Sequence, residues 1–368
     1  MAKKLKDICD FYSGTGFPTQ FQGETEGDYP FYKVGDIAQN AVAGKVYLES
    51  CNNYISEELA KTIKGCIVPK NTVVFAKIGE ALKLNRRVIT SCDCLIDNNI
   101  MGIAPKTDFL RIQYFYFFMK NLKMQTLAES TTVPSVRKTV LENCEIEVPS
   151  LDKQKEIENK LAFSQKIIEK RKQELSALDD LIKARFVEMF GDPTTNPKGY
   201  PIKVLSEIAE YWNGLTYKPE DVSDEGIIVL RSSNIQNATL DFADIVRVSC
   251  KIGDKKYVQD NDILMCSRNG SARLVGKVAL IKEVEEPMSF GAFMMIIRSA
   301  YYSYLMTYFQ MPAFRMQIAT GATTTINQIT GRMLDAVKLP VPDADTINQF
   351  ADFVKQVDKS KVAVLKIF

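Results

Sequence analysis

The chain has 368 residues, with 47 Lys and Arg against 45 Asp and Glu and no histidine, for a formal net charge of +2. This length predicts two domains, each large enough to bury its own core. Near-neutrality excludes a uniformly basic surface, so any nucleic-acid contact must be local. Charges at Lys3, Lys4 and Lys6 interrupt the N-terminus, and the longest apolar stretches are too short for a membrane span. We therefore expect a cytoplasmic protein that contacts no membrane.

Two parts of the chain, about 190–200 residues apart, show the same order of features. Leu5, Ile8 and Phe11 lead to Gly14-Thr15-Gly16, and Leu205, Ile208 and Tyr211 lead to Gly214-Leu215-Thr216. Residues 71–79 align with residues 262–270, and each part closes on a Val-Pro pair, at 148–149 and 341–342. The repeat predicts two copies of one module. We expect modules at 1–150 and 193–343 and helices at 151–192 and 344–368.

Each module is predicted to be of mixed α/β structure, which makes the fold class α+β. Apolar and β-branched runs predict strands at 72–75, 87–90, 227–230, 263–265 and 275–281. Helices rich in aromatic residues are predicted at 112–127 and 301–319. At helical spacing their aromatic side chains favour a core position, although stacking on bases is the alternative; they include Phe115, Phe118, Tyr304 and Phe309.

The two predicted long helices carry apolar residues at the four-three spacing of a coiled coil. The seam comprises Ile157, Leu161, Ile168, Leu175, Leu178 and Ile182 in the first helix and Ile347, Phe350, Val354, Val357 and Val364 in the second. An exposed apolar stripe is unfavourable in water. We therefore predict an antiparallel pair, with Leu175, Leu178 and Ile182 against Ile347, Val354 and Val357. The alternative is that each helix packs only on its own module.

Local groups of cations occur at matching points of the repeat. They are Lys77, Lys83, Arg86 and Arg87 in the first module and Arg268, Arg273 and Lys277 in the second. Lys77 and Arg268 follow a predicted strand, where a long cation can reach a base edge. Polar loops carry Ser130 and Thr131 in one module and Thr323, Thr324 and Asn327 in the other, and such side chains suit phosphate contacts. The alternative is solvated charges and ordinary turns.

Residues for catalysis are missing. The absence of histidine excludes the usual general base and any Ser-His or Cys-His couple. The chain has neither a Gly-Lys-Ser/Thr phosphate loop nor a Gly-x-Gly-x-x-Gly turn. Its eight cysteines include no Cys-x-x-Cys pair, and we expect them to be reduced. We expect this chain to be non-catalytic and to bind neither a metal nor a cofactor.

Three segments point to a known family when taken in order. Val-Pro-Ser-Leu-Asp-Lys-Gln-Lys-Glu-Ile at 148–157 begins the first long helix, Phe-Val-Glu-Met-Phe-Gly-Asp-Pro at 186–193 ends it, and Val341-Pro342 precedes the second. With the two modules, this order resembles the specificity (S) subunit of type I restriction-modification systems.

The resemblance implies two target-recognition domains, each reading one half of a bipartite, asymmetric site in double-stranded DNA. The helices would separate these domains and dock methyltransferase (M) subunits, and restriction (R) subunits can join the complex. S-adenosylmethionine, ATP and Mg²⁺ are expected on the partner subunits. The second helix is shorter than the family pattern, which implies a weaker docking site or an incomplete chain. The competing hypothesis is a non-catalytic coiled-coil scaffold for protein interactions.

Overall fold

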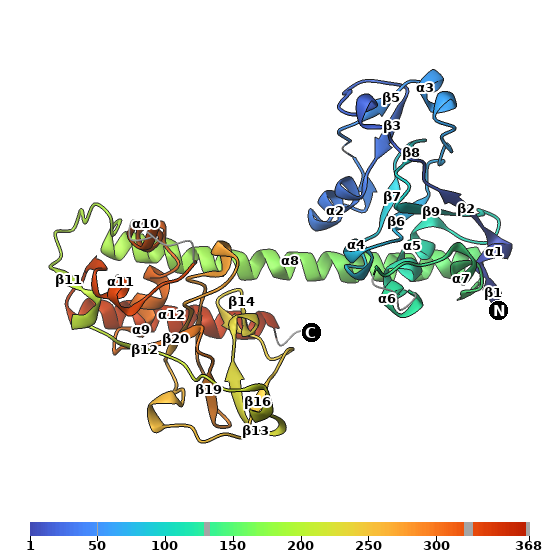
Figure 1. Cartoon of the computed structure of the whole chain (residues 1–368). Helices are drawn as coiled ribbons and strands as arrows, with labels where there is room; N and C mark the ends of the chain where they lie inside the picture. The colour runs from blue at the N-terminus through green and yellow to red at the C-terminus, as the bar shows by residue number, and fades with distance from the viewer. Residues whose placement is uncertain (50, 129–132, 320–326, 366–368) are drawn as a thin grey trace. The chain divides into compact units, whose positions relative to one another are not determined.

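The computed structural model describes residues 1–49, 51–128, 133–319 and 327–365. The chain divides into two compact units, unit 1 (Met1–Ile168) and unit 2 (Glu169–Phe368). Helix α8 (Leu151–Phe190) has 40 residues and contributes its first part to unit 1 and its last part to unit 2 (Figure 1). The predicted mixed α/β architecture with long helices is confirmed.

Unit 1 is built on a five-stranded sheet in the order β2-β9-β6-β7-β4 and a three-stranded sheet in the order β5-β3-β8. The first sheet comprises β2 (Cys9–Ser13), β9 (Ile100–Pro105), β6 (Val73–Ala76), β7 (Val88–Thr90) and β4 (Tyr47–Leu48), and the second comprises β5 (Tyr54–Ile55), β3 (Tyr29–Tyr32) and β8 (Leu95–Ile96). Strand β1 (Ala2–Lys4) pairs with β10 (Glu145–Glu147). The helices before α8 are α1 (Leu5–Ile8), η1 (Thr19–Phe21), α2 (Val34–Val42), α3 (Glu57–Thr62), α4 (Glu80–Lys83), α5 (Ile112–Asn121), α6 (Met124–Leu127) and α7 (Lys138–Glu142).

Unit 2 repeats this plan with sheets in the orders β12-β20-β17-β18 and β16-β13-β19. The strands are β12 (Glu210–Asn213), β20 (Met294–Arg298), β17 (Ile263–Cys266), β18 (Val278–Leu280), β16 (Arg247–Val248), β13 (Val222–Leu230) and β19 (Met288–Phe290), with the pairs β11 (Ile202–Val204) and β21 (Lys338–Pro340), and β14 (Ile235–Gln236) and β15 (Thr239–Leu240). The helices after α8 are η2 (Leu205–Glu207), η3 (Pro219–Asp221), η4 (Ser232–Asn234), η5 (Asp254–Lys256), η6 (Ala272–Leu274), α9 (Tyr302–Tyr308), α10 (Pro312–Ala319), α11 (Gly331–Asp335) and α12 (Ala344–Leu365).

The predicted repeat is present, but its alignment at the central strand is wrong by one residue. Strand β6 pairs Val73 with Ile103 of β9, and β17 pairs Ile263 with Ile297 of β20. Two residues beyond the end of each strand, the isolated bridges Ile78–Ser135 and Arg268–Gln328 occupy the same position in the two units, so Ile78 corresponds to Arg268, and Lys77 corresponds to Ser267. Both strands are buried along their whole length. A strand buried on both faces has no apolar–polar alternation, so the sequence could not set its register.

The two Gly motifs of the repeat mark a close approach between backbones. Thr15 and Leu215, which follow the glycines, form parallel bridges to Asp97 and Gly291. A Cβ atom on Gly14 would overlap the carbonyl oxygen of Asp97, and one on Gly214 would overlap that of Phe290. Each glycine therefore lets the chain just after β2 or β12 pass close to the backbone at the end of a strand of the second sheet, which is β8 in unit 1 and β19 in unit 2.

Replacing Gly14 by Ala should lower the free energy of unfolding of unit 1 by about 2–4 kcal/mol, because backbone must move to admit the methyl group. The matched control is Gly16→Ala, where the added Cβ meets no atom within 4 Å. Urea unfolding of the full chain compares the two variants. Equal midpoints would contradict the close approach at Gly14.

The predicted strands are confirmed, but each predicted aromatic helix is broken in two. Residues 112–127 form α5 and α6, and residues 301–319 form α9 and α10. In unit 1 the break at Leu122 is held by tertiary contacts: Arg87 Nη2 donates to Leu122 O at 3.1 Å, and the Met124 N–H donates to Asn85 Oδ1 at 3.2 Å. In unit 2 the second piece begins at Pro312, which suits the first turn of a helix. The expected core position of the aromatics is confirmed for Phe115, Tyr304 and Phe309, which are fully buried, while Phe118 is half-buried.

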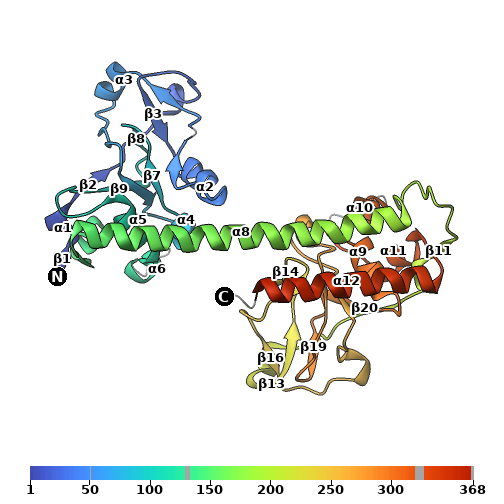
Figure 2. The ribbon, with the colours of Figure 1, turned by 180° about the vertical axis from the view of Figure 1, so that it is seen from behind.

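In unit 2 the last part of α8 lies antiparallel to α12, as Figures 1 and 2 show. Near the end of α8, Phe186 and Phe190 contact Phe350 with ring centroids 5.6 and 5.3 Å apart. Further back along α8, Asp179 pairs with Lys361 at 2.5 Å. The predicted antiparallel pairing is therefore present.

The predicted seam, however, is wrong in two places. The contact runs through Ile182, Phe186 and Phe190 at i, i+4 spacing, together with Ile347, Phe350 and Val354, whereas the heptad spacing passed over both phenylalanines. In addition, residues 161–170 are all exposed, and Leu161 and Ile168 keep 39% and 40% of their surface. The four-three pattern predicted burial there, but within unit 1 neither residue belongs to a core cluster.

Phe350→Ala should lower the free energy of unfolding of unit 2 by about 3–5 kcal/mol, since it empties the centre of this aromatic cluster. Phe163→Ala is the control, because Phe163 lies on α8 with 65% of its surface exposed and should change stability by less than about 0.5 kcal/mol. Thermal unfolding of the two variants measures the difference. A harmless Phe350 substitution would refute the packing of α12 on α8.

In unit 1 the beginning of α8 is attached through polar groups instead. Glu158 accepts from the Tyr114 N–H at 2.9 Å and from Arg111 Nε at 2.7 Å. Gln154, which is fully buried, accepts from the Arg111 N–H at 2.9 Å and donates to Phe109 O at 2.8 Å. These contacts satisfy N–H groups at the start of α5 that have no partner within that helix. A carboxylate at a helix N-terminus also complements the helix dipole.

Glu158→Ala should lower the stability of unit 1 by about 2 kcal/mol, because it leaves the start of α5 without its acceptor. Glu156→Ala provides the comparison: this exposed residue, two positions earlier on α8, forms surface ion pairs with Lys153 and Lys160, so a change within about 0.5 kcal/mol is expected. Urea unfolding distinguishes the two. Similar losses would mean that Glu158 acts only as a surface charge.

Candidate nucleic-acid interface

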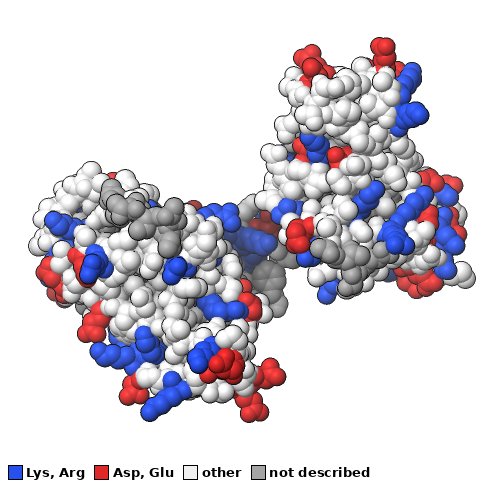
Figure 3. Space-filling view, viewed as in Figure 1, with Lys and Arg blue, Asp and Glu red and all other residues white. Residues whose placement is uncertain are grey.

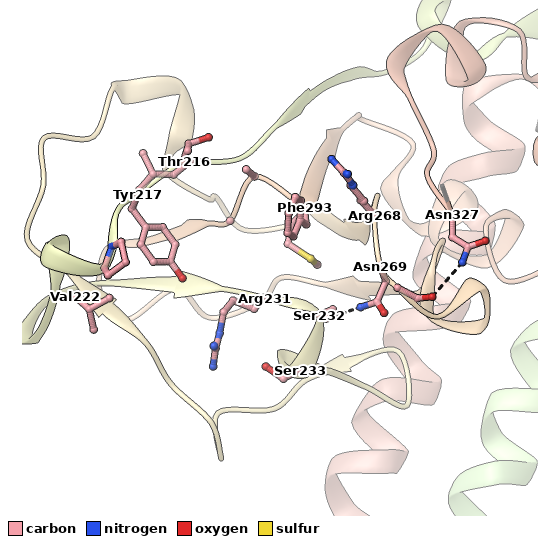
Figure 4. Close-up of a pocket in the computed structure, with 16 residues that line it drawn as sticks. Thr216, Tyr217, Val222, Arg231, Ser232, Ser233, Arg268, Asn269, Phe293 and Asn327 are labelled. Carbon is pink, nitrogen blue, oxygen red and sulfur yellow. Dashed lines mark hydrogen bonds between the residues drawn. The ribbon is translucent and has the colours of Figure 1, made fainter. Parts of the chain in front are cut away.

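Unit 2 contains a groove of about 1200 Å³ at the place where several strands end (Figure 4). Its walls come from the segment after β12, the end of β13, the end of β17 and the turn between β19 and β20. The lining includes Thr216, Tyr217, Arg231, Ser232, Ser233, Arg268, Asn269, Phe293 and Asn327. Polar side chains and two aromatic rings therefore face one open hollow.

One wall is positioned by a capping contact after β13. The Arg231 N–H donates to Asn234 Oδ1 at 2.8 Å, and Asn234 is 1% exposed. The amide of Asn234 in turn donates to the carbonyls of Asp241 and Asp244 at 2.8 and 2.9 Å. The backbone of Arg231 is thereby fixed at the rim, while its guanidinium pairs with the Asp244 carboxylate at 2.7 Å.

The opposite wall carries Arg268 directly after β17. Its N–H donates to Phe293 O at 3.1 Å, and its guanidinium carbon lies 5.2 Å from the centroid of the Phe293 ring. Phe293 keeps 59% of its surface exposed. In Figure 4, Arg268 lies beside Phe293, whereas Arg231 extends away from that pair.

Unit 1 has a recess of about 620 Å³ at the corresponding place, lined by Lys33, Val34, Gly35, Asp36, Gln39, Asn52, Asn53, Asp97 and Asn99. Lys33 follows β3 as Arg231 follows β13, and its N–H donates to Asp36 Oδ2 at 2.7 Å. Asp36 is buried, and this burial raises the pKa of its carboxyl group. Asn99 precedes β9 as Phe293 precedes β20, and both accept at their carbonyl oxygen from the residue after the central strand, each at 2.9 Å. The hollow is therefore a property of the repeated fold.

Two of the predicted DNA-binding cations make hydrogen bonds within the protein. Arg87 is 4% exposed; its Nη2 donates to Asn85 Oδ1 at 2.6 Å and to Leu122 O, and burial lowers its pKa to about 10. Lys277 is half-buried and donates to Ile235 O at 2.7 Å. A DNA contact by Arg87 is therefore wrong, because a buried guanidinium whose donors hold a helix break cannot reach a ligand.

The other predicted cations lie at or near the surface. Arg268 lines the groove of unit 2 and Arg273 is exposed in η6. Lys83 is exposed and pairs with Glu80 at 2.7 Å, and Lys77 and Arg86 are half-buried. Their contact with DNA stays a prediction.

The predicted phosphate-binding loops fall mainly outside the described residues, and this applies to Ser130, Thr131, Thr323 and Thr324. Asn327 is described: it is exposed, lines the groove and donates from Nδ2 to Gly270 O at 3.2 Å. Residues after the two loops make equivalent contacts: the Gly79 N–H donates to Pro134 O, and the Asn269 N–H donates to Asn327 O.

Sequence reasoning missed Lys33, Arg231, Phe293 and Asn99. The first two carried a usable signal, since each is a cation that follows an apolar strand and stands three residues before a capping Asp or Asn. Phe293 and Asn99 carried none, because each lies in a turn whose partner strand is far away in the sequence. On the face shown in Figure 3, basic side chains lie among acidic ones, in agreement with the small net charge.

The comparisons with known proteins decide the family. Residues 1–177 and 197–366 match the family described as the type I restriction modification DNA specificity domain. The chain belongs to this family. Two matched segments, one in each half of the chain, agree with the repeat seen in the fold.

Members of the type I specificity family from bacteria and archaea are similar to this chain. The EcoKI specificity subunit of Escherichia coli (strain K12) is 26% identical over 178 residues, 45% of this chain and 38% of that protein. The StySPI specificity subunit of Salmonella potsdam is 26% identical over 184 residues, 46% of this chain and 40% of that protein. The matched part thus spans about two fifths of these relatives. The MjaVIII specificity subunit of Methanocaldococcus jannaschii is 21% identical, over 95% of this chain and 91% of that protein.

The fold has a match among solved structures as well. A chain from a study of complex assembly and conformational transition in the type I R-M system has a TM-score of 0.53, at 14% identity, and the match covers 100% of this chain and 92% of that one. This likeness concerns the fold. Among the described helices of the present chain, none is long and apolar enough to cross a membrane.

Proposed function

We propose that this chain is the DNA-specificity subunit of a type I restriction-modification complex. Each unit reads one half of a bipartite, asymmetric site in double-stranded DNA. The observation that carries the proposal is the duplicated family match, together with a hollow at the same place in both units. Two similar but non-identical recognition surfaces suit two different half-sites.

The chemistry of the hollows supports base recognition more than bulk electrostatic binding. A net charge of +2 offers little non-specific attraction to DNA. The groove of unit 2 instead brings together guanidinium, amide, hydroxyl and aromatic groups, which are the groups that read base edges. Affinity therefore depends strongly on partner subunits that close around the duplex.

The partners in this proposal are methyltransferase subunits, which would carry S-adenosylmethionine, with ATP and Mg²⁺ on restriction subunits where these join. In this proposal the catalytic groups belong to the partner subunits. The exposed part of α8 supports a protein partner: Leu161, Phe163, Ile167 and Ile168 keep 39–65% of their surface within 161–170. Apolar side chains gathered on an exposed helix are typical of a protein interface. The scaffold hypothesis lacks an observation of its own, since the family match accounts for both the helices and the modules.

Co-expression with the methyltransferase subunit of the same system should methylate DNA at one bipartite motif, mapped by sequencing of modified bases. Exchange of residues 1–150 for the corresponding module of a relative should change one half of the motif and leave the other half intact. A stable complex with an active partner that methylates no defined motif would contradict the proposal.

The purified complex should also bind the mapped site in a salt-dependent way. The logarithm of its binding constant should fall linearly with the logarithm of the salt concentration, with a slope set by the number of phosphate contacts.

A further inference from the structure

We propose that Arg268 reads a guanine in the half-site of unit 2, whereas Asn99 reads an adenine in the half-site of unit 1. This inference rests on the proposed function and extends it to the base that each unit selects. It follows from comparing the two units position by position at the rim of the hollow. Equivalent places there carry side chains of different chemistry.

Strand pairing fixes which positions of the two units are equivalent. The bridges Ile78–Ser135 and Arg268–Gln328 place Ile78 and Arg268 at the same point of the fold. The pairs Ala76–Ile100 and Cys266–Met294 then place Asn99 opposite the same strand end as Phe293. Unit 2 therefore presents an arginine beside an aromatic ring, and unit 1 presents an isoleucine beside an asparagine.

Arg268 is available for a ligand and is already oriented. Among the described residues, neither a hydrogen bond nor an ion pair engages its guanidinium, which instead lies over the Phe293 ring at 5.2 Å. Other arginines of unit 2 are engaged: Arg231 pairs with Asp244, and Arg298 pairs with Asp262, each at 2.7 Å. A guanidinium held against an aromatic face keeps its planar N–H edge directed outward. That edge matches O6 and N7 of guanine in a bidentate contact.

Phe293 adds a second reason to place a base at this point. Its ring keeps 59% of its surface exposed inside a groove, where cover by a base or a thymine methyl group would remove apolar surface from water. The Phe293 backbone is held by two N–H donors, those of Ser267 and Arg268, at 2.9 and 3.1 Å. The ring and the guanidinium therefore form one preorganised pair.

In unit 1 the equivalent residues, Ile78 and Asn99, suit a different base. Asn99 is exposed and lines the recess, and its backbone is fixed by donation to Asp97 Oδ1 and acceptance from the Lys77 N–H, both at 2.9 Å. Among the residues that the structure describes, none hydrogen-bonds to the Asn99 carboxamide, and such a group matches N6 and N7 of adenine in a bidentate contact. Ile78 follows Lys77, whose N–H binds the Asn99 carbonyl, and its side chain, 37% exposed, offers an apolar surface for a thymine methyl group. The two half-sites should thus differ at equivalent positions, which makes the whole site asymmetric.

The test is motif mapping with the full chain and its co-expressed methyltransferase subunit. Arg268→Ala should relax the preference for guanine at one position of one half-site by about 5- to 150-fold, the range expected for a bidentate contact. Arg268→Lys keeps the charge but loses the fork, so it should retain overall methylation and still lose much of this discrimination. Asn99→Ala should relax an adenine in the other half-site alone.

Arg332→Ala is the matched control, since Arg332 is an exposed arginine of unit 2 in α11 that neither lines the groove nor is among the predicted DNA-binding residues, and it should leave the preference for every base unchanged. Each variant must unfold at the wild-type temperature, which is expected because the side chains replaced are exposed. A motif that Arg268→Ala leaves intact, or methylation that falls equally on all sequences as for a phosphate contact, overturns this inference while the proposed function stands. Absence of any bipartite motif with the wild-type chain overturns both.

Discussion

In each unit the rest of the structure depends on the antiparallel pairing of one central strand with its neighbours. This strand is β6 in unit 1 and β17 in unit 2. Each strand is buried on both faces and is paired with a neighbour on either side. Its register therefore determines which residue first emerges at the rim of the hollow. A shift of one residue would turn every side chain to the opposite face. It would also remove Arg268 from Phe293 and separate the rim residues from the capped turns after β3 and β13.

The same fold tolerates different chemistry wherever the register is kept. At the start of α8, Gln154 and Glu158 attach the helix to unit 1 through hydrogen bonds to the beginning of α5. At the corresponding place of unit 2, Ile347 and Phe350 of α12 lie in an apolar cluster with Phe186 and Phe190. At the rim, Ile78 and Asn99 correspond to Arg268 and Phe293. A scaffold that depends on backbone pairing leaves such side chains free to differ, which suits two units with two targets.

Strands and helices whose signals lie in neighbouring residues could be predicted well from the sequence. The strands appear because runs such as 72–75 and 263–265 are apolar and β-branched, and the long helix appears because its apolar spacing and flanking Pro and Gly residues are local signals. Prediction failed where a distant partner decided the outcome. The break at Leu122 exists because Arg87 and Asn85 capture the freed backbone groups. The same contact explains why Arg87, a cation in a basic cluster by sequence, is buried.

The sequence by itself determined the repeat, the mixed α/β modules, the two long helices and, through its ordered motifs, the family, since all of these depend on local periodicity and on short motifs that recur along the chain. The tertiary structure alone decided the register of the central strands, the seam through Phe186 and Phe190, and the grouping of Arg231, Arg268 and Phe293 around one groove. These three lie on different strands and turns and meet only through sheet pairing. The physical reason is that fully buried strands carry no alternating pattern, so only hydrogen bonds to partners far along the chain can align them.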